Sequence, residues 1–375
     1  MATPNYQIPN KITFYPSYPQ YAHVAGLISY TELDHIINKE TGLVDNDYGL
    51  TEEERFNLIT LDPSNTTRFM SLNTGQVFYQ FSDPTYNPLN FDFWLVLGHK
   101  AKEDGGSLGS LAIRPRQAYF DTVGESGGGQ DPHIYNGDVV NGGNTPALNG
   151  WSLSNITGNL NANDMTQAPN LNFSGFGIRL VKSDGSDIDT EIGCCLWGKK
   201  WEAPQNTDIS SSISYNYGIK NKKTIAGKNI TNINYYKPNK WLLDAWELDD
   251  TASDTRDTPT ESRNGLRTWN VRWSFLQDKY ATNQNNMRNS NLWTQDSDSE
   301  YSTGSDGTSL YNSTDGIDFV TSVIKPTLGG TLPMVVQISE SNNPDQFAIV
   351  RMTKYKITQK NPKFVDISLT LEEQV

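Results

Sequence analysis

Four carboxylates and two tryptophans cluster between residues 241 and 250. The cluster consists of Trp241, Asp244, Trp246, Glu247, Asp249 and Asp250. A glycosidase needs two carboxyl groups about 5–10 Å apart, and tryptophan rings can stack on sugars. The same pattern also fits a solvated acidic face beside two packed tryptophans. Glycan hydrolysis, glycan binding and a surface without a site therefore remain open as interpretations of this stretch.

Oxygen-rich side chains between Asp184 and Glu191 are of the type that binds calcium. They lack the spacing of an EF-hand loop, which needs glycine at the sixth position and glutamate at the twelfth. We therefore interpret them as an acidic turn between strands. The four histidines, His23, His35, His99 and His133, are widely scattered, and no HxxxH or CxxC pattern is present. We expect no metal site.

Cys194 and Cys195 are the two cysteines of the chain. Neighbouring residues on a strand point to opposite faces, so we expect no disulfide between them. Their setting in the apolar stretch 192–197 predicts buried, inert thiols. His99 follows another apolar stretch and could act as a base, but we interpret it as a residue that caps a strand end by hydrogen bonding.

No glycine-rich loop follows a strand and opens a helix, so a nucleotide site is not expected. With no metal site and no activated nucleophile expected, the sequence predicts no catalytic, cofactor-binding or metal-binding residues. We predict that the protein is not an enzyme.

The composition indicates a folded, acidic protein. Its 375 residues include 9 Trp, 18 Tyr and 14 Phe, which are enough bulky side chains for two ordinary domains or one large β domain. The net charge of −13 would repel phosphate backbones, so we expect no nucleic-acid partner. We see no run of about 18 apolar residues and no secretory signal pattern, so we expect no membrane insertion.

The C-terminal stretch from residue 331 to 371 has the pattern of a β-meander. Turn signals at 342–345 and 361–362 separate three extended segments. The last segment alternates strictly and places four apolar side chains on one face. These are Val365, Ile367, Leu369 and Leu371. Such a face must be covered by another sheet or a helix.

Other stretches predict further strands and two short helices. The expected strands are 75–81, 91–97, 173–181, 191–197, 209–217 and 267–275. The last of them should pack a face of Trp269, Val271, Trp273 and Phe275. A capping box at Thr51 and Glu54 predicts a helix over 51–59, and Asp318 could cap a helix over 319–324.

The resulting fold class is all-β. We expect two tandem antiparallel β-sandwiches, the first of jelly-roll type, with one or two short helices and long loops. The boundaries are an irregular N-terminal arm at 1–62, a sandwich at 63–204 and a second sandwich with the meander at 205–375. The polar stretches 124–164 and 283–314 are expected to be exposed insertions available for contacts.

Several short stretches of the sequence resemble a family of virion proteins from marine tailed bacteriophages. They include the stretches 217–220, 224–227, 267–275, 329–333, 342–349 and 365–369, with 235–236 and 246–248 between them. Gly98 and His99 also resemble that family, although Lys100 stands where the family has asparagine. The family is similar in plan to distal-tail or tail-tip adaptor proteins.

The resemblance implies a structural virion protein of the phage tail, assembled in the host cytoplasm. Such a protein would form a homo-oligomeric ring, by analogy a hexamer, at the tail tip or baseplate. Its partners would be tail tube or hub proteins and fibre or receptor-binding proteins. The alternative is a tail protein that binds or degrades glycans of the host surface.

Overall fold

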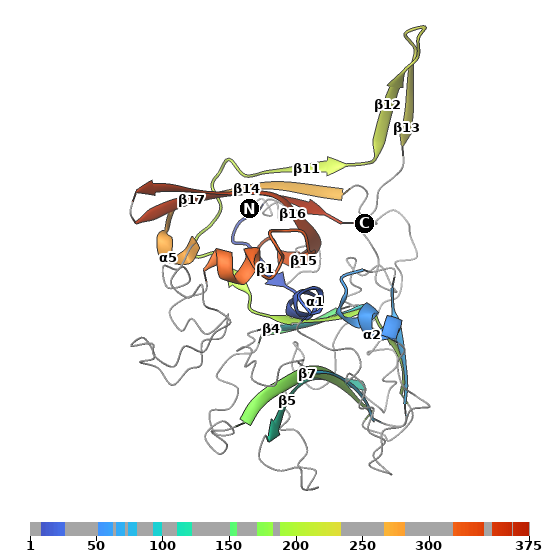
Figure 1. Ribbon diagram of the computed structural model, residues 1–375. Coiled ribbons are helices and arrows are strands. Elements are labelled where there is room, and N and C mark those ends of the chain that lie inside the picture. Colours follow the sequence, from blue (N-terminus) through green and yellow to red (C-terminus); the bar gives the residue numbers. More distant parts are fainter. Residues whose placement is uncertain are drawn as a thin grey trace, which may run out of the picture.

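The computed structural model describes thirteen ranges of the chain. They are 9–26, 52–62, 65–71, 74–80, 93–99, 111–121, 151–155, 171–182, 188–233, 266–281, 318–340, 347–361 and 363–374. Antiparallel strands dominate these ranges and form one sheet of seven strands with several smaller sheets (Figure 1). The all-β fold expected from the sequence is confirmed. Among the described helices, none has the length and apolar character needed to cross a membrane.

The main sheet combines strands from both ends and the middle of the chain. In spatial order its strands are β10 (Trp201–Glu202), β1 (Thr13–Pro16), β15 (Met334–Gln337), β16 (Phe347–Asn361), β17 (Phe364–Glu373), β14 (Leu266–Gln277) and β11 (Ser212–Asn216). β15, β16 and β17 pair in sequence order as antiparallel neighbours. The predicted C-terminal meander is therefore confirmed, and it forms the centre of this sheet.

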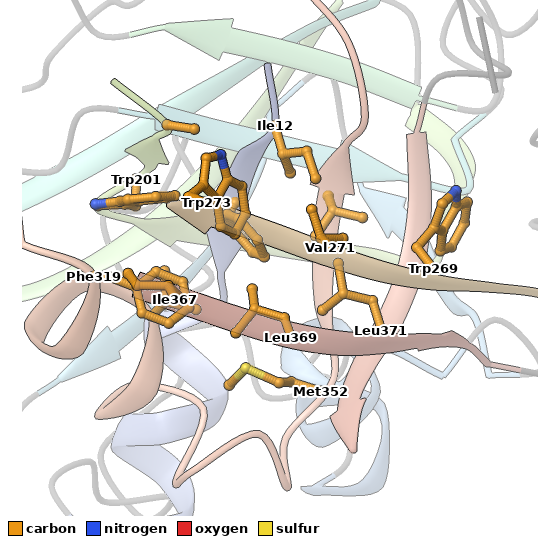
Figure 2. Close-up of a cluster of buried hydrophobic side chains, with 14 of the residues drawn as sticks. Ile12, Trp201, Trp269, Val271, Trp273, Phe319, Met352, Ile367, Leu369 and Leu371 are labelled. Atoms are coloured by element: carbon orange, nitrogen blue, oxygen red, sulfur yellow. The ribbon is translucent and has the colours of Figure 1, made fainter. Parts of the chain in front are cut away.

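The main sheet is strongly curled around one hydrophobic core (Figure 2). Trp201 on β10 and Trp273 on β14 are separated by four strands in the sheet order, yet their rings meet edge to face with centroids 5.7 Å apart. Phe14 and Phe319 contact the same Trp201 ring. We call the whole buried cluster around these aromatic rings, which includes residues of β1, β14, β15, β16 and β17, the curled core. The predicted apolar face of β17, from Val365 to Leu371, is fully buried in it.

A bulge in β14 changes one predicted core position. The register with β17 shifts between Trp273 and Leu276 because β14 carries one extra residue there. Phe275 has a positive φ of 58° and is 63% exposed, whereas Leu276 is buried in the curled core. The prediction that Phe275 packs on the same face as Trp269 and Trp273 is therefore wrong, since strict alternation ends at the bulge.

The expectation of an irregular N-terminus is wrong for residues 13–24. Strand β1 is followed directly by helix α1 (Tyr18–Val24), whose N-cap residue Ser17 accepts a hydrogen bond from the amide of Gln20. Pro19 lies in the first turn, where an amide hydrogen has no helical partner to lose. The strand forms because β10 and β15 pair with it from both sides.

A second sheet covers the opposite face of β1, β15 and β16. Its order is β6 (Trp151–Asn155), β4 (Phe93–Leu97), β9 (Cys194–Gly198). Side chains alternate between the two cores: Phe14 enters the curled core, while Tyr15 packs edge to face on Phe93 at 5.0 Å between centroids. This arrangement is a β-sandwich, and the apolar segment 347–350 is buried on both faces.

The remaining elements include expected and unexpected ones: β3 and β7 match expected strands, whereas β2, β5 and helix α5 had no predicted counterpart, and residues 188–191 of the predicted acidic turn belong to strand β8. A three-stranded sheet has the order β3 (Thr74–Gln80), β7 (Leu171–Lys182), β5 (Leu111–Asp121), and β2 (Thr67–Ser71) pairs with β8 (Ile188–Ile192). Helix α2 spans Glu52–Ile59, while Thr51 of the expected capping box lies outside the described residues. Asp318 accepts a hydrogen bond from the amide of Thr321 at the start of a π-helix, η3 (Val320–Ile324). A four-residue helix, α5 (Asp278–Ala281), follows β14.

Two β-strands of five residues each extend away from the main sheet as a hairpin (Figure 1). They are β12 (Ile219–Lys223) and β13 (Asn229–Ile233). The hairpin follows the edge strand β11 along the chain. Strands from all three expected regions, 1–62, 63–204 and 205–375, meet in the main sheet. The main sheet is therefore built from strands that are distant in the sequence. The domain boundaries inferred from the sequence stay a prediction.

One buried ion pair fastens β14 to the end of β17. Arg267 Nη2 lies 2.7 Å from Glu373 Oε1, and the side chains are 1% and 3% exposed. The same guanidinium donates to the carbonyl of Phe347 at 3.1 Å and lies 4.8 Å from the ring centroid of Trp269. The pair therefore links β14, β16 and β17 at one end of the sheet.

We expect Arg267→Met to lower the free energy of unfolding by about 3–5 kcal/mol, because it leaves Glu373 buried and unpaired. The double variant Arg267→Met/Glu373→Leu should recover much of this loss. Urea unfolding followed by tryptophan fluorescence measures both values. Equal losses in the single and double variants would show that the uncompensated charge is not the cause.

Candidate functional site

An open groove of about 530 Å³ lies where β14, β16 and β17 run side by side. Alternation along β17 sends Leu369 and Leu371 into the curled core, so Ser368 and Thr370 belong to the other face. The polar residues that line the groove are Asn270, Arg272, Lys354, Lys356, Ser368 and Thr370. We call it the β14–β17 groove.

Strand register arranges these groups in two rows across the sheet. Lys354 pairs with Thr370, which pairs with Asn270. Lys356 pairs with Ser368, which pairs with Arg272. The first row therefore has a cation, Lys354, only at its β16 end, followed by a hydroxyl and an amide group. The second row has a cation at each end, Lys356 and Arg272, with the hydroxyl of Ser368 between them.

The groove is positively charged within an acidic protein. Arg272, Lys354 and Lys356 line it, and its described lining includes no Asp or Glu. Lys354 and Lys356 are exposed and form no ion pair with any residue in the described ranges. Such a lining suits an anionic or hydroxyl-rich ligand.

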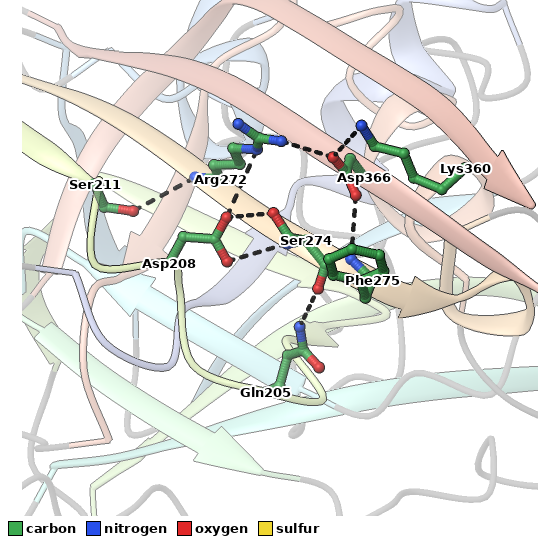
Figure 3. Close-up of polar contacts among 8 residues, drawn as sticks. All are labelled: Gln205, Asp208, Ser211, Arg272, Ser274, Phe275, Lys360 and Asp366. Atoms are coloured by element: carbon green, nitrogen blue, oxygen red, sulfur yellow. Dashed lines mark hydrogen bonds and ion pairs between the residues drawn. The ribbon is translucent and has the colours of Figure 1, made fainter.

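Arg272 is held at one end of the groove by two carboxylates (Figure 3). Its Nη2 lies 2.7 Å from Asp366 Oδ2, and its Nε lies 3.6 Å from Asp208 Oδ2. Lys360 Nζ approaches the same Asp366 oxygen at 3.2 Å, and the amide of Phe275 donates to the other oxygen at 3.1 Å. The bulge described above places that amide, so the strained backbone of Phe275 takes part in the network.

Asp208 ties the segment before β11 to β14. It accepts hydrogen bonds from the amide and the hydroxyl of Ser274, at 3.1 and 2.5 Å, and its own amide donates to the carbonyl of Arg272. Gln205 donates to the carbonyl of Ser274 at 2.9 Å. Both carboxylates of the network therefore accept several hydrogen bonds, which suits a structural role better than proton transfer.

The electrostatics of Asp366 support the same conclusion. Burial alone would raise the pKa of this carboxyl, but hydrogen bonds from Arg272, the Phe275 amide and Lys360 outweigh burial and lower the pKa below its ordinary value. In turn, Asp366 raises the pKa of Arg272. Asp366 is therefore ionised at neutral pH and is no general acid there.

Three of the sequence-derived candidates are placed in buried positions. Cys194 and Cys195 are free and fully buried, and burial raises the pKa of both thiols well above the usual value. They are therefore poor nucleophiles, as the sequence indicated. His99 is also buried, directly after β4.

His23 lies in the last turn of α1 against the ring of Phe56, and residues 188–191 belong to β8. The other candidates lie outside the described residues. These are the carboxylates and tryptophans between 241 and 250, the first part of the 184–191 turn, and two histidines, His35 and His133. Within the described ranges, no three His, Cys, Asp or Glu side chains are grouped so that they could hold a metal ion. The β14–β17 groove was not among the sequence candidates, because its parts are about a hundred residues apart.

No protein-family model matches the chain, and the search of curated proteins finds no match.

We expect Asp366→Ala to lower the free energy of unfolding by about 1–3 kcal/mol, because the Phe275 amide, Arg272 and Lys360 lose their shared acceptor. Asp366→Asn should cost less, since its amide oxygen can still accept from Phe275.

The folded-state pKa of Asp366 is depressed, so its ionic contribution is present above the unfolded pKa of about 3.9 and is lost as the pH falls through the folded value.

The difference in stability between the native protein and Asp366→Asn should therefore be constant above about pH 5 and shrink as the pH falls below about 3.9. Urea unfolding at several pH values measures it. A difference that does not change with pH would contradict the assigned ionic role.

Proposed function

We propose that the protein is a structural virion protein of a bacteriophage tail. It forms a ring or adaptor at the tail tip or baseplate and docks other tail or receptor-binding proteins. The observation that carries this proposal is a rigid curled sheet from which an exposed hairpin projects. The resemblance of several short stretches to marine phage virion proteins supports the same assignment.

The curled sheet is suited to bear load. Its two faces meet two separate cores at β1, β15 and the segment 347–350 of β16, so these parts of the sheet are buried on both sides. The N-terminal strand lies between β10 and β15, which joins the start of the described chain to the C-terminal meander. A scaffold of this kind keeps the relative positions of the elements at its surface fixed.

The hairpin is suited to docking. All residues of β12 are exposed, and so are the residues of β13 whose exposure is described. On this proposal the protein has no catalytic task, and it acts by holding neighbours in a homo-oligomeric ring, with six copies as the working number. Its partners are tail tube or hub proteins and fibre or receptor-binding proteins.

A virion protein must be present in purified phage particles in a fixed stoichiometry. We expect mass spectrometry of gradient-purified particles to contain peptides of this chain, and antibody labelling to place it at one end of the tail by electron microscopy. The major capsid protein serves as the positive control. Absence of the chain from intact particles would refute the proposal.

The β14–β17 groove favours a second candidate function, which is binding of acidic glycans on the host surface. Exposed Lys354 and Lys356 can pair with carboxylate or sulfate groups, and Ser368 and Thr370 can hydrogen-bond sugar hydroxyls. The described lining contains no carboxylate pair for hydrolysis. Binding is therefore the function that this groove favours over degradation.

We expect the isolated protein to bind uronic-acid oligosaccharides on a glycan array, and Lys354→Ala/Lys356→Ala to weaken binding by about tenfold or more, since two ion pairs are lost. Added salt should weaken binding of the native protein. Lys363→Ala, at an exposed turn, is the matched control. Equal binding by all three proteins would remove the groove from consideration.

A further inference from the structure

The two rows of the β14–β17 groove differ in how far their polar groups are already used. In the first row the hydroxyl of Thr370 donates to the side-chain oxygen of Asn270 at 3.0 Å, so these two groups serve each other. In the second row Ser368 is half-buried, and its hydroxyl has no hydrogen-bond partner among the residues that the structure describes. A hydroxyl can donate one hydrogen bond and accept two. The second row therefore has an unused donor at its centre.

Arg272, at one end of the second row, is held in place without being fully used. Its Nη2 pairs with Asp366 and its Nε approaches Asp208, but its Nη1 has no acceptor within the described ranges. The side chain is 48% exposed and lines the groove. A guanidinium that is already oriented loses little conformational freedom when it binds a further acceptor. Arg272 is therefore a pre-oriented donor on the wall of the groove.

The charges of the two rows also differ. The second row has Lys356 and Arg272 at its ends, whereas the first row has only Lys354. Exposed Glu372 lies two residues beyond Thr370 on the same face of β17, so it offsets the charge of the first row. At the other end of the groove, the two carboxylates that hold Arg272 are matched by two cations, so the charge of Lys356 stays uncompensated. An anion is therefore attracted more strongly to the second row than to the first.

We propose that Lys356, Ser368 and Arg272 form an oxyanion subsite, which takes one carboxylate or sulfate group of an acidic glycan. Adjacent strands lie about 4.8 Å apart, so the two cations start roughly 10 Å apart and their long side chains can converge over the hydroxyl of Ser368. A guanidinium forms short, charge-assisted hydrogen bonds to such groups. The first row then contacts uncharged parts of the neighbouring sugar. The inference rests on the glycan-binding candidate function and names the residues that recognise the charge of the glycan.

The side chains on this face of the groove favour a glycan over a single-stranded nucleic acid, whose phosphates are also oxyanions. Proteins that bind single strands stack the bases on aromatic side chains. Tyr355 pairs with Leu369, which points into the curled core, so Tyr355 belongs to the opposite face of β16. The outward-facing side chains of the described lining are hydroxyl, amide or cationic groups, and these groups suit the hydroxyls and the charge of an acidic sugar.

The test compares Lys356→Ala with Lys354→Ala in the full chain. Both lysines are exposed on β16, and each variant removes one positive charge, so Lys354→Ala is the matched control. The probes are a uronic-acid oligosaccharide, the same oligosaccharide with its carboxyl groups reduced to hydroxyls, and a sulfated neutral oligosaccharide of equal length. Isothermal titration calorimetry measures the Kd of each pair, and circular dichroism verifies that each variant is folded.

We expect the native protein to bind the uronic-acid probe at least about tenfold more tightly than the carboxyl-reduced probe. Lys356→Ala should lower this preference by about threefold or more, whereas Lys354→Ala should change it by less than about twofold. Ser368→Ala, which leaves every charge in place, should also lower the preference. A loss of affinity for the sulfated probe in Lys356→Ala would show that the subsite accepts sulfate, and unchanged affinity for that probe would assign the subsite to carboxylate.

Equal effects of Lys356→Ala and Lys354→Ala on the preference would overturn the subsite and leave glycan binding by the groove intact. No binding of any oligosaccharide would overturn the glycan-binding candidate together with the subsite. Tighter binding of a single-stranded oligonucleotide than of the uronic-acid probe would overturn the assigned ligand class. None of these results bears on whether the chain is part of the virion, which particle analysis decides separately.

Discussion

The contact between Trp201 and Trp273 is the constraint on which the rest of the described structure depends. It joins an edge strand to a strand five places along the same sheet, and it can form only if the sheet curls. Curling encloses the apolar face of β17 and the π-helix η3 in one core. The outer face of the same strands is then left for polar groups, which is where the β14–β17 groove lies.

An ion pair and a β-bulge stabilise the sheet where its strands end or change direction. The buried pair of Arg267 and Glu373 closes one end, and the bulge at Phe275 lies near the other. The bulge turns the Phe275 side chain outward and its amide toward Asp366. A local irregularity thus becomes part of the polar network that holds Arg272 beside the groove.

Two surfaces of the described structure carry clusters of cations. The groove presents Arg272, which is held by carboxylates, and the exposed Lys354 and Lys356. The hairpin presents lysines on an element that extends from the edge of the sheet. Both surfaces carry lysines in a chain whose net charge is −13, and both are placed by strands of one scaffold.

Local sequence patterns determined much of this protein. Turn signals delimited the three strands of the meander, period-two alternation identified the buried face of β17, and apolar stretches identified strand β4 and the buried setting of Cys194 and Cys195, because each of these patterns depends on neighbours along the chain. Only the tertiary structure decided the position of β1 between β10 and β15, the outward turn of Phe275 and the composition of the groove. Arg272 and Asp366 are 94 residues apart, and no local pattern encodes the register that brings them together. That register is decided by which strands can bury their faces in a common core.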